Sequence, residues 1–318
     1  DLLLYIALLE ATGLLGNISM WGYLRKFVSP VSLSKLRVRR HLKEVVVYFI
    51  PTIATSVYTI LDKTMIGWFS GSSKSQNGYY EYATGFVNMA KILIISFNAV
   101  MSARMSYLFA RDRGEEIRER IGGSVDFVLL LGLPITFGLA GIADKFVPWF
   151  LGDQYGPVAW LLKLCSPLVL IVGFSDCMGS QILTPSGQRA RSAKVIVAGA
   201  CVNACLNLVL IPHFQAAGAA AASISAKTLI TGLYSRLCRG YIGPAMLVRY
   251  GWKRLAAAVV MLGAVLALGN WMGVGPLTTF AQIGAGGLVY FAVLLLLRDG
   301  TVLGQLRMAV IKFMGYGG

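Results

Sequence analysis

The sequence predicts an all-α protein, a polytopic bundle of transmembrane helices. Hydrophobic residues make up 56% of the chain and charged residues only 14%, and the mean hydropathy is +0.68. Soluble domains carry roughly a quarter of charged residues. A second observation is the placement of Lys and Arg, which gather in alternate connections between apolar segments. The chain is therefore expected to cross a lipid bilayer repeatedly.

A transmembrane helix needs about 20 mainly apolar residues, and glycine or proline is tolerated inside it. Pro51, Pro134 and Pro167 fall within spans, where each removes a backbone hydrogen bond and permits a kink. The stretch AAGAAAASISA (216–226) places small side chains on all faces of one span, which lets helices approach closely. In order along the chain we expect nine spans, at residues 2–24, 45–69, 79–109, 124–148, 156–183, 193–212, 216–237, 255–273 and 279–297.

Basic residues are retained on the cytoplasmic side during insertion, which fixes the expected topology. With residues 25–44 inside, the outer connections hold only Lys74 and Lys145 of the 29 basic residues. The first span then begins outside and the C-terminus lies in the cytoplasm. The formal charge of +15 follows mostly from this topology, so it gives no reason to expect a nucleic-acid partner.

Charged groups remain inside the spans, at a cost of about 2.5 kcal/mol or more each at the bilayer centre, so they normally face the protein interior or a watery cavity. Helical phase at about 100° per residue places Tyr58 and Asp62 on one polar stripe of the second span. The third span has a comparable stripe, so the two helices are typical of a hydrated cavity wall. The polar stripe of the third span consists of Glu81, Thr84, Asn88, Lys91, Asn98 and Ser102.

Two interpretations of these charges stay open. The groups can pair with one another and hold helices together, for example Asp62 with Lys91 or Glu81 with Lys63. Alternatively, a cavity with spare positive charge suits an anionic substrate, because the cations in the spans outnumber the anions. The cations are Lys63, Lys91, Arg104, Lys163 and Lys227, and the anions are Asp62, Glu81, Asp126 and Asp176.

The sequence offers little for catalysis or for a metal or cofactor. Its two histidines, His41 and His213, assemble neither a triad nor a His-based metal site, and no GxxxxGKS/T motif for ATP occurs. The five cysteines lie in or at the ends of spans and are expected to pack there. The stretch RDRGEEIRER (111–120) balances acids and bases, as in a solvated helical turn. We expect no enzyme activity and no cofactor.

Four stretches, in this order, carry a resemblance to a known family. They resemble bacterial oligosaccharide flippases, the polysaccharide transporter family of the multidrug/oligosaccharidyl-lipid/polysaccharide exporter superfamily. Together they reach across roughly residues 45–238. The stretches are DKTMIGWFSGSSKSQNGYYEYA (62–83), WFLGDQYGPVAWLLKLCSPLVLIVGFSDCMGSQILTPSGQ (149–188), NACLNLVLIPHF (203–214) and AAGAAAASISAK (216–227).

The resemblance implies two six-helix lobes around a central cavity, with two additional C-terminal helices. Because the chain opens on Asp1 with an apolar segment already under way, we expect it to be the C-terminal part of a longer protein. Residues 1–24 would be the last helix of the first lobe and 25–44 a basic cytoplasmic linker. Residues 45–238 would form the second lobe, and 239–318 the two extra helices and a cytoplasmic tail.

The implied function is movement of an undecaprenyl-diphosphate-linked oligosaccharide across the bacterial cytoplasmic membrane for O-antigen, capsule or exopolysaccharide assembly. Membrane lipids and the polysaccharide polymerase or ligase machinery are the expected partners. Asp62 or Glu81 would couple H⁺ or Na⁺. Lys63, Lys91, Lys163 and Arg104 would hold the diphosphate, and Tyr58, Asn88 and Asn98 would meet sugar hydroxyls.

Two alternatives come from other functional classes. An ion-coupled drug exporter of the same fold would transport mainly cations and favour net acidic spans, opposite to the charges found here. A polytopic enzyme acting on lipid-linked sugars would need a sizeable outer loop with catalytic groups. The expected outer connections are short, and only residues 70–78 and 149–155 offer much exposed chain.

Overall fold

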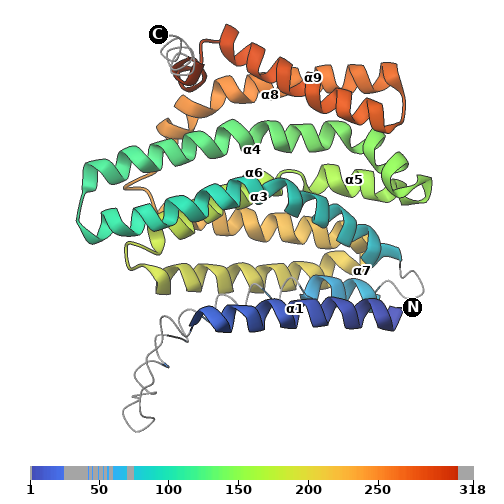
Figure 1. Ribbon diagram of the computed structural model, residues 1–318, viewed down its shortest axis with the longest axis horizontal. Coiled ribbons are helices and arrows are strands. Elements are labelled where there is room, and N and C mark those ends of the chain that lie inside the picture. The colour runs from blue at the N-terminus through green and yellow to red at the C-terminus, as the bar shows by residue number, and fades with distance from the viewer. Residues whose placement is uncertain are drawn as a thin grey trace. The chain divides into compact units, whose positions relative to one another are not determined.

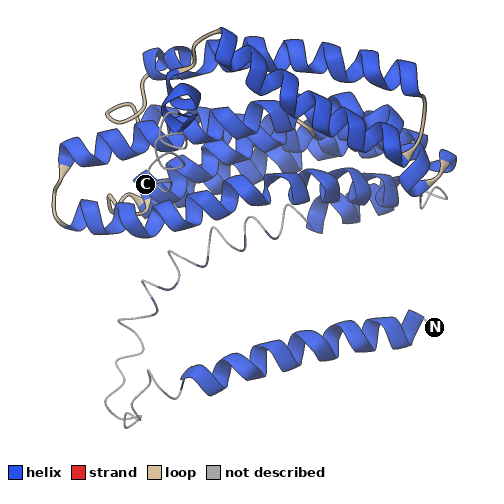
Figure 2. Ribbon diagram, turned by 45° about the horizontal axis from the view of Figure 1, so that its top comes forward, coloured by secondary structure: helices blue, strands red, loops and turns tan. Residues whose placement is uncertain are grey.

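The computed structural model describes residues 2–24, 60–69 and 75–306, together with a few single positions between 42 and 56. Within these ranges the chain consists of helices joined by short turns and contains no strand (Figure 2). The chain divides into two compact units, residues 1–46 and 47–318, which we describe separately. The all-α class predicted from the composition is confirmed.

In the first unit, helix α1 (Leu2–Leu24) has 23 residues, which corresponds to about 35 Å at 1.5 Å per residue. Its bounds coincide with the first predicted span. Large apolar side chains such as Leu3, Leu15 and Trp21 are exposed, as expected for a helix surrounded by lipid.

The second unit begins with a helical segment at 60–69 and continues with two long helices, α3 (Ser75–Ala110) and α4 (Gly114–Leu151). The next span is broken. It consists of the short η2 (Asp153–Tyr155), α5 (Gly156–Cys165), α6 (Leu168–Met178) and a π-helical turn η3 (Gly179–Leu183). The two halves meet at 42° around Pro167, because proline cannot donate the next helical hydrogen bond.

Helix α7 (Arg189–Leu237) is a hairpin of two limbs, 189–214 and 216–237. The backbone leaves helical geometry at Gln215, with φ 49° and ψ −125°. A Cβ added to Gly218 would lie 2.4 Å from the carbonyl oxygen of Leu210, so the limbs touch directly after the turn. At the far end, Ser192 Oγ and Tyr234 Oη lie 2.6 Å apart. The small residues of the second limb thus permit the close approach predicted for this stretch.

Helices α8 (Pro244–Met272) and α9 (Pro276–Leu296) pack together against α4 (Figure 1). Glycines make this close packing possible. A Cβ on Gly141 of α4 or on Gly286 of α9 would lie 2.9 Å from a methyl group of Val265 in α8. The three helices therefore interlock around Val265.

Five of the described helices, α3, α4, α7, α8 and α9, are long and apolar enough to cross a membrane, and the bent pair α5–α6 makes a sixth. Helix α7 covers two of the predicted spans by itself. The predicted span 45–69 is described mainly at 60–69. The prediction of nine spans is thus not confirmed, whereas the polytopic class is.

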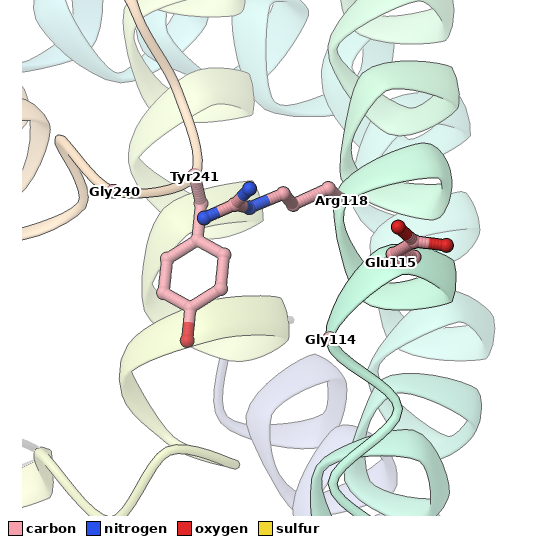
Figure 3. A pocket seen from close by; sticks show the side chains of 5 residues that line it. All are labelled: Gly114, Glu115, Arg118, Gly240 and Tyr241. Atoms are coloured by element: carbon pink, nitrogen blue, oxygen red, sulfur yellow. The ribbon is translucent and has the colours of Figure 1, made fainter.

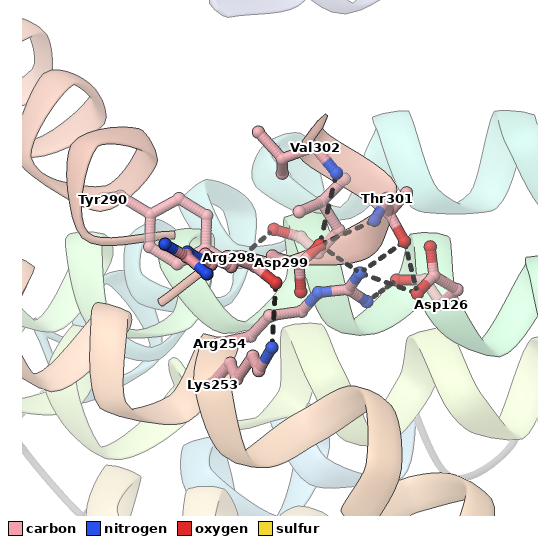
Figure 4. A network of polar contacts seen from close by, with 9 residues as sticks. Asp126, Lys253, Arg254, Tyr290, Arg298, Asp299, Thr301 and Val302 are labelled. Atoms are coloured by element: carbon pink, nitrogen blue, oxygen red, sulfur yellow. Dashed lines mark hydrogen bonds and ion pairs between the residues drawn. The ribbon is translucent and has the colours of Figure 1, made fainter. Parts of the chain in front are cut away.

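One buried cation fastens α8 to α4 (Figure 4). Arg254 precedes the predicted span 255–273 by one residue and is therefore expected in a cytoplasmic connection, but its side chain is 0% exposed within α8. Its guanidinium lies 2.6 Å from Asp126 Oδ1 of α4 and 3.5 Å from Asp299 Oδ1, just beyond α9. Thr301 Oγ donates a further hydrogen bond to Asp126. A buried guanidinium requires such carboxylates, because an unpaired charge is costly away from water.

Candidate functional site: a lysine-lined cavity

A cavity of about 160 Å³ lies where the segment 60–69, α3, α6 and the second limb of α7 meet. We call it the lysine cavity. Three lysines and two carboxylates line it, so its formal charge is +1 when all five are ionised. The charged residues are Asp62, Lys63, Glu81, Lys91 and Lys227, and the others are Tyr80, Thr84, Val87, Asn88, Leu168, Val172 and Ser223.

The lining of the cavity by α3 follows from helical spacing. Glu81, Thr84, Asn88 and Lys91 are three or four residues apart and thus lie on one face. These are the first four members of the polar stripe predicted for this helix. The opposite face of α3 carries aromatic side chains, among them Phe86, which packs edge to face against Phe146 of α4.

Lys63 and Glu81 form an ion pair at the rim of the cavity. Their side chains are 41% and 57% exposed, and such exposed pairs contribute little to stability. This is one of the two pairings considered from the sequence. The other, Asp62 with Lys91, is not formed. Lys91 of α3 and Lys227 of α7 line the same cavity, so its cationic part is built by the two helices together.

Asp62 is buried in a cluster of neutral polar groups and is only 1% exposed. Its carboxylate accepts hydrogen bonds from Tyr80 Oη at 2.8 Å, Ser223 Oγ at 2.7 Å and Asn207 Nδ2 at 2.5 Å. Asn207 also donates to Asn203 Oδ1 at 3.1 Å. The cluster thus joins the segment 60–69 to α3 and to both limbs of α7.

Asn98, predicted to meet a sugar, lies elsewhere. It is completely buried between α3 and the broken span, where its amide donates to Asp176 Oδ2 at 3.0 Å and to the carbonyl of Gly173 at 3.1 Å. Gln181 of the π-helical turn donates to Asn98 Oδ1 at 2.9 Å. All its polar atoms are therefore engaged in holding α3 to α6 and η3.

Lys163 and Arg104 also lie outside the lysine cavity. Lys163 Nζ is 2.5 Å from Asp144 Oδ2, an anion that the charge count from the sequence had omitted. Arg104 lies near the C-terminal end of α3, and its guanidinium is 3.9 Å from Glu116. Tyr58 falls outside the described residues.

Several residues of the site were not foreseen. Lys227 was recognised as a charge within a span but not as part of the cavity, and Asn203, Asn207 and Ser223 were not singled out. A signal was present, because Asn203 and Asn207 are four residues apart and so share one face of an apolar helix. What the sequence could not provide was the fold of α7, which brings its two limbs to Asp62.

Comparison with known proteins supports the resemblance predicted from the sequence. The family described as "Polysaccharide biosynthesis protein" matches residues 11–159. The "Putative O-antigen transporter" of Escherichia coli K12 is 24% identical over 216 residues, which cover 65% of this chain and 49% of that protein. The "Probable low-salt glycan biosynthesis flippase Agl15" of Haloferax volcanii is 24% identical over 255 residues, 78% of this chain and 52% of that protein. The chain thus spans about half the length of these curated relatives.

Solved structures show the same fold. The lipid II flippase MurJ, in an inward closed conformation, superposes with a TM-score of 0.68 at 14% identity, over 83% of this chain and 56% of MurJ. A transporter of the MOP superfamily from Pyrococcus furiosus gives a TM-score of 0.50 at 16% identity, over 84% and 67% of the two chains. The predicted resemblance is therefore confirmed: this chain is a multi-pass membrane protein, and the curated relatives reported above are named as a transporter and a flippase of polysaccharide biosynthesis.

Proposed function

We propose that the protein flips an undecaprenyl-diphosphate-linked oligosaccharide from the inner to the outer leaflet of a bacterial cytoplasmic membrane, for assembly of surface polysaccharide. In this proposal the lysine cavity holds the diphosphate, and alternating access carries it across. Residues 45–238 act as the second lobe of the exporter, and the C-terminus is cytoplasmic. Polymerase or ligase machinery takes over the glycan outside.

The observation that carries the proposal is the convergence of lysines from three helical segments on one cavity inside the bundle. Lys63 comes from the segment 60–69, Lys91 from α3 and Lys227 from α7. Placing three ammonium groups together inside a membrane protein is unfavourable unless anions neutralise them, and the two carboxylates of the cavity balance only two of its three positive charges. A diphosphate offers several acceptor oxygens and negative charge, which lysines bind as point charges.

The size of the cavity suits the charged part of the substrate. About 160 Å³ is below the roughly 300–1,000 Å³ of most small-molecule pockets, so the cavity accommodates a phosphate group and not an oligosaccharide. We infer that the sugars lie beyond its rim. Asn88 lines the same cavity wall, and its amide can donate hydrogen bonds to them. The Thr84 hydroxyl donates to the carbonyl of Tyr80 at 2.7 Å, so it can only accept a hydrogen bond from a sugar.

Transport in this direction needs no ATP site in the chain. An inside-negative membrane potential favours outward movement of negative charge by about 2.3 kcal/mol per charge per 100 mV. The doubly charged diphosphate gains this energy only if the positive charges of the lysines do not cross the membrane with it. The lysines must therefore bind the substrate reversibly.

The proposal is tested in a strain whose surface polysaccharide depends on this protein. Lys91→Ala is expected to insert normally but to accumulate lipid-linked oligosaccharide on the cytoplasmic leaflet, and Lys91→Arg to restore export. Lys63→Ala should have a weaker effect, because Glu81 already pairs with Lys63. Normal export by Lys91→Ala, at unchanged protein level in the membrane, would contradict the proposal.

Asp62 is the better of the two carboxylates proposed for ion coupling. Glu81 is engaged by Lys63 at an exposed rim, whereas Asp62 is buried among hydroxyl and amide groups. In addition, Asn207 Oδ1 is buried without a hydrogen-bond partner. Oxygen atoms of this kind around a carboxylate suit a proton or Na⁺, because hard cations take oxygen ligands.

Ion coupling is tested by measuring transport under imposed H⁺ or Na⁺ gradients. Wild-type protein is expected to respond to one of the two, and Asp62→Asn to respond to neither while retaining slow transport driven by the membrane potential. Glu81→Gln serves as the matched control and should keep the wild-type response. A full response in Asp62→Asn would show that this cluster only holds the helices together.

A further inference from the structure

A second, larger cavity of about 440 Å³ lies at one end of the bundle, between the turn from α3 to α4 and the turn from α7 to α8. Gly114, Glu115, Arg118, Gly240 and Tyr241 line it (Figure 3). It shares no lining residue with the lysine cavity. Its volume is within the usual range for small-molecule pockets.

The polar ends of three lining side chains have no partner among the described residues. Arg118, Glu115 and the hydroxyl of Tyr241 make no hydrogen bond or ion pair with another described residue, although the Tyr241 ring packs against Phe109. Figure 3 shows the Arg118 guanidinium extending from α4 toward Tyr241.

Neighbouring arginines in the same turn behave differently. Arg113 Nη1 lies 3.2 Å from Glu116, and the Arg111 guanidinium stacks over the Tyr107 ring at 4.2 Å from its centroid. Arg113 and Arg111 are thus engaged, whereas Arg118 keeps unused donors beside the cavity. An arginine with free donors next to an open cavity is suited to a phosphate, which it can grip with two parallel hydrogen bonds.

The position of the cavity points to the lipid headgroups as the source of that phosphate. Helix α3 ends at Ala110 and α4 begins at Gly114, while α7 ends at Leu237 and α8 begins at Pro244. The cavity therefore lies where the apolar helices end, at the level of the membrane interface. The half-exposed ring of Tyr107 is typical of that region.

The charges in the cavity are balanced. Arg118 supplies one positive charge and Glu115 one negative charge, and residues three apart on a helix have Cβ atoms about 5–6 Å apart. A headgroup with a phosphate and an ammonium a few bonds apart presents the same two charges in the opposite order. Amide groups in the first turn of α4, which no side chain caps, can add hydrogen bonds to the phosphate.

We propose that this cavity binds the headgroup of a zwitterionic phospholipid, with its phosphate on Arg118 and Tyr241 and its ammonium on Glu115. The ammonium must carry N–H donors for a hydrogen bond to Glu115, so phosphatidylethanolamine fits better than phosphatidylcholine. A lipid held here would lie beside both turns at this end of the bundle. This inference does not depend on the transported substrate.

The test is lipid binding to the purified protein, measured by native mass spectrometry with phosphatidylethanolamine, phosphatidylcholine or phosphatidylglycerol added. Wild type should retain phosphatidylethanolamine most tightly. Arg118→Ala should weaken this binding about tenfold or more, since a charge-assisted hydrogen bond contributes enough for a factor of that order. Arg113→Ala, in the same turn but engaged by Glu116, is the matched control and should bind like wild type.

Glu115→Gln removes the negative charge proposed to bind the ammonium and leaves Arg118 unchanged. The lipid preference should therefore shift from phosphatidylethanolamine to phosphatidylglycerol. Gly240→Leu should exclude the lipid without disturbing the fold, because nothing lies within 4 Å of a Cβ added there. The proposal is overturned if phosphatidylglycerol is preferred by wild type, if Arg118→Ala binds like wild type, or if inorganic phosphate competes fully with the lipid. The last result would identify a phosphate site unrelated to lipid.

Discussion

Replacing Asp126 by asparagine removes the main negative charge that compensates the buried guanidinium of Arg254. The contact between them is 2.6 Å long, and the two side chains are 0% and 11% exposed, so water cannot take over the lost interaction. Breaking a buried ion pair by removing one partner costs about 3–5 kcal/mol. Asp299, 3.5 Å away, retains part of the compensation, so we expect about 3 kcal/mol for Asp126→Asn.

The same chain provides the control for this prediction. The pair Lys63–Glu81 is 41% and 57% exposed, and exposed pairs contribute about 1 kcal/mol or less. Glu81→Gln should therefore change the free energy of unfolding by less than about 1 kcal/mol. Both values can be measured by titrating SDS into the protein in mixed micelles.

A double variant tests the physical reason. Arg254→Met combined with Asp126→Asn leaves no guanidinium to compensate, so it should lose less stability than the two single variants added together. Equal small effects of Asp126→Asn and Glu81→Gln would show that the buried pair contributes no more to stability than the exposed one. Simply additive effects of Arg254→Met and Asp126→Asn would show that the two side chains do not stabilise each other.

Two further changes probe the packing around the site. Gly218→Ala should destabilise the α7 hairpin by about 1–3 kcal/mol, because the added methyl would lie 2.4 Å from the Leu210 carbonyl oxygen. The control is Gly232→Ala, where an added methyl meets nothing within 4 Å. It should be neutral or slightly stabilising in the same SDS titration. Asn98→Ala should cost about 1–3 kcal/mol by leaving Asp176 without its amide donor, and should lower the protein level in the membrane, whereas a role in sugar binding would lower export at an unchanged level.

The helical class and several element bounds follow from composition and periodicity alone. The first predicted span, 2–24, coincides with α1, and the turn at Gln215 falls between the predicted spans 193–212 and 216–237. Apolar length is a local property, so it can be read from the sequence. Helices such as α3 and α4 extend beyond the predicted limits, because charged and polar residues continue the same helix outside the apolar stretch.

The site could be predicted only in part, because helical phase shows which residues share a face but not which helix covers that face. The stripe on α3 predicted Asn88 and Lys91 together with Asn98. In the structure the first two reach the lysine cavity, while α6 and η3 cover Asn98. The burial of Arg254 depends likewise on the carboxylate of Asp126, which is distant along the chain and which no local pattern reveals.

In the proposed mechanism, lysines of this cavity hold the diphosphate of the transported lipid. This role is tested by the rate at which the purified protein, reconstituted in proteoliposomes, flips a diphosphate-linked oligosaccharide under an imposed membrane potential. Lys91→Ala should slow flipping strongly, while Lys163→Ala should flip at the wild-type rate, because Lys163 pairs with Asp144 away from the cavity. Equal rates for wild type and Lys91→Ala, or a greater loss in Lys163→Ala, would contradict the account.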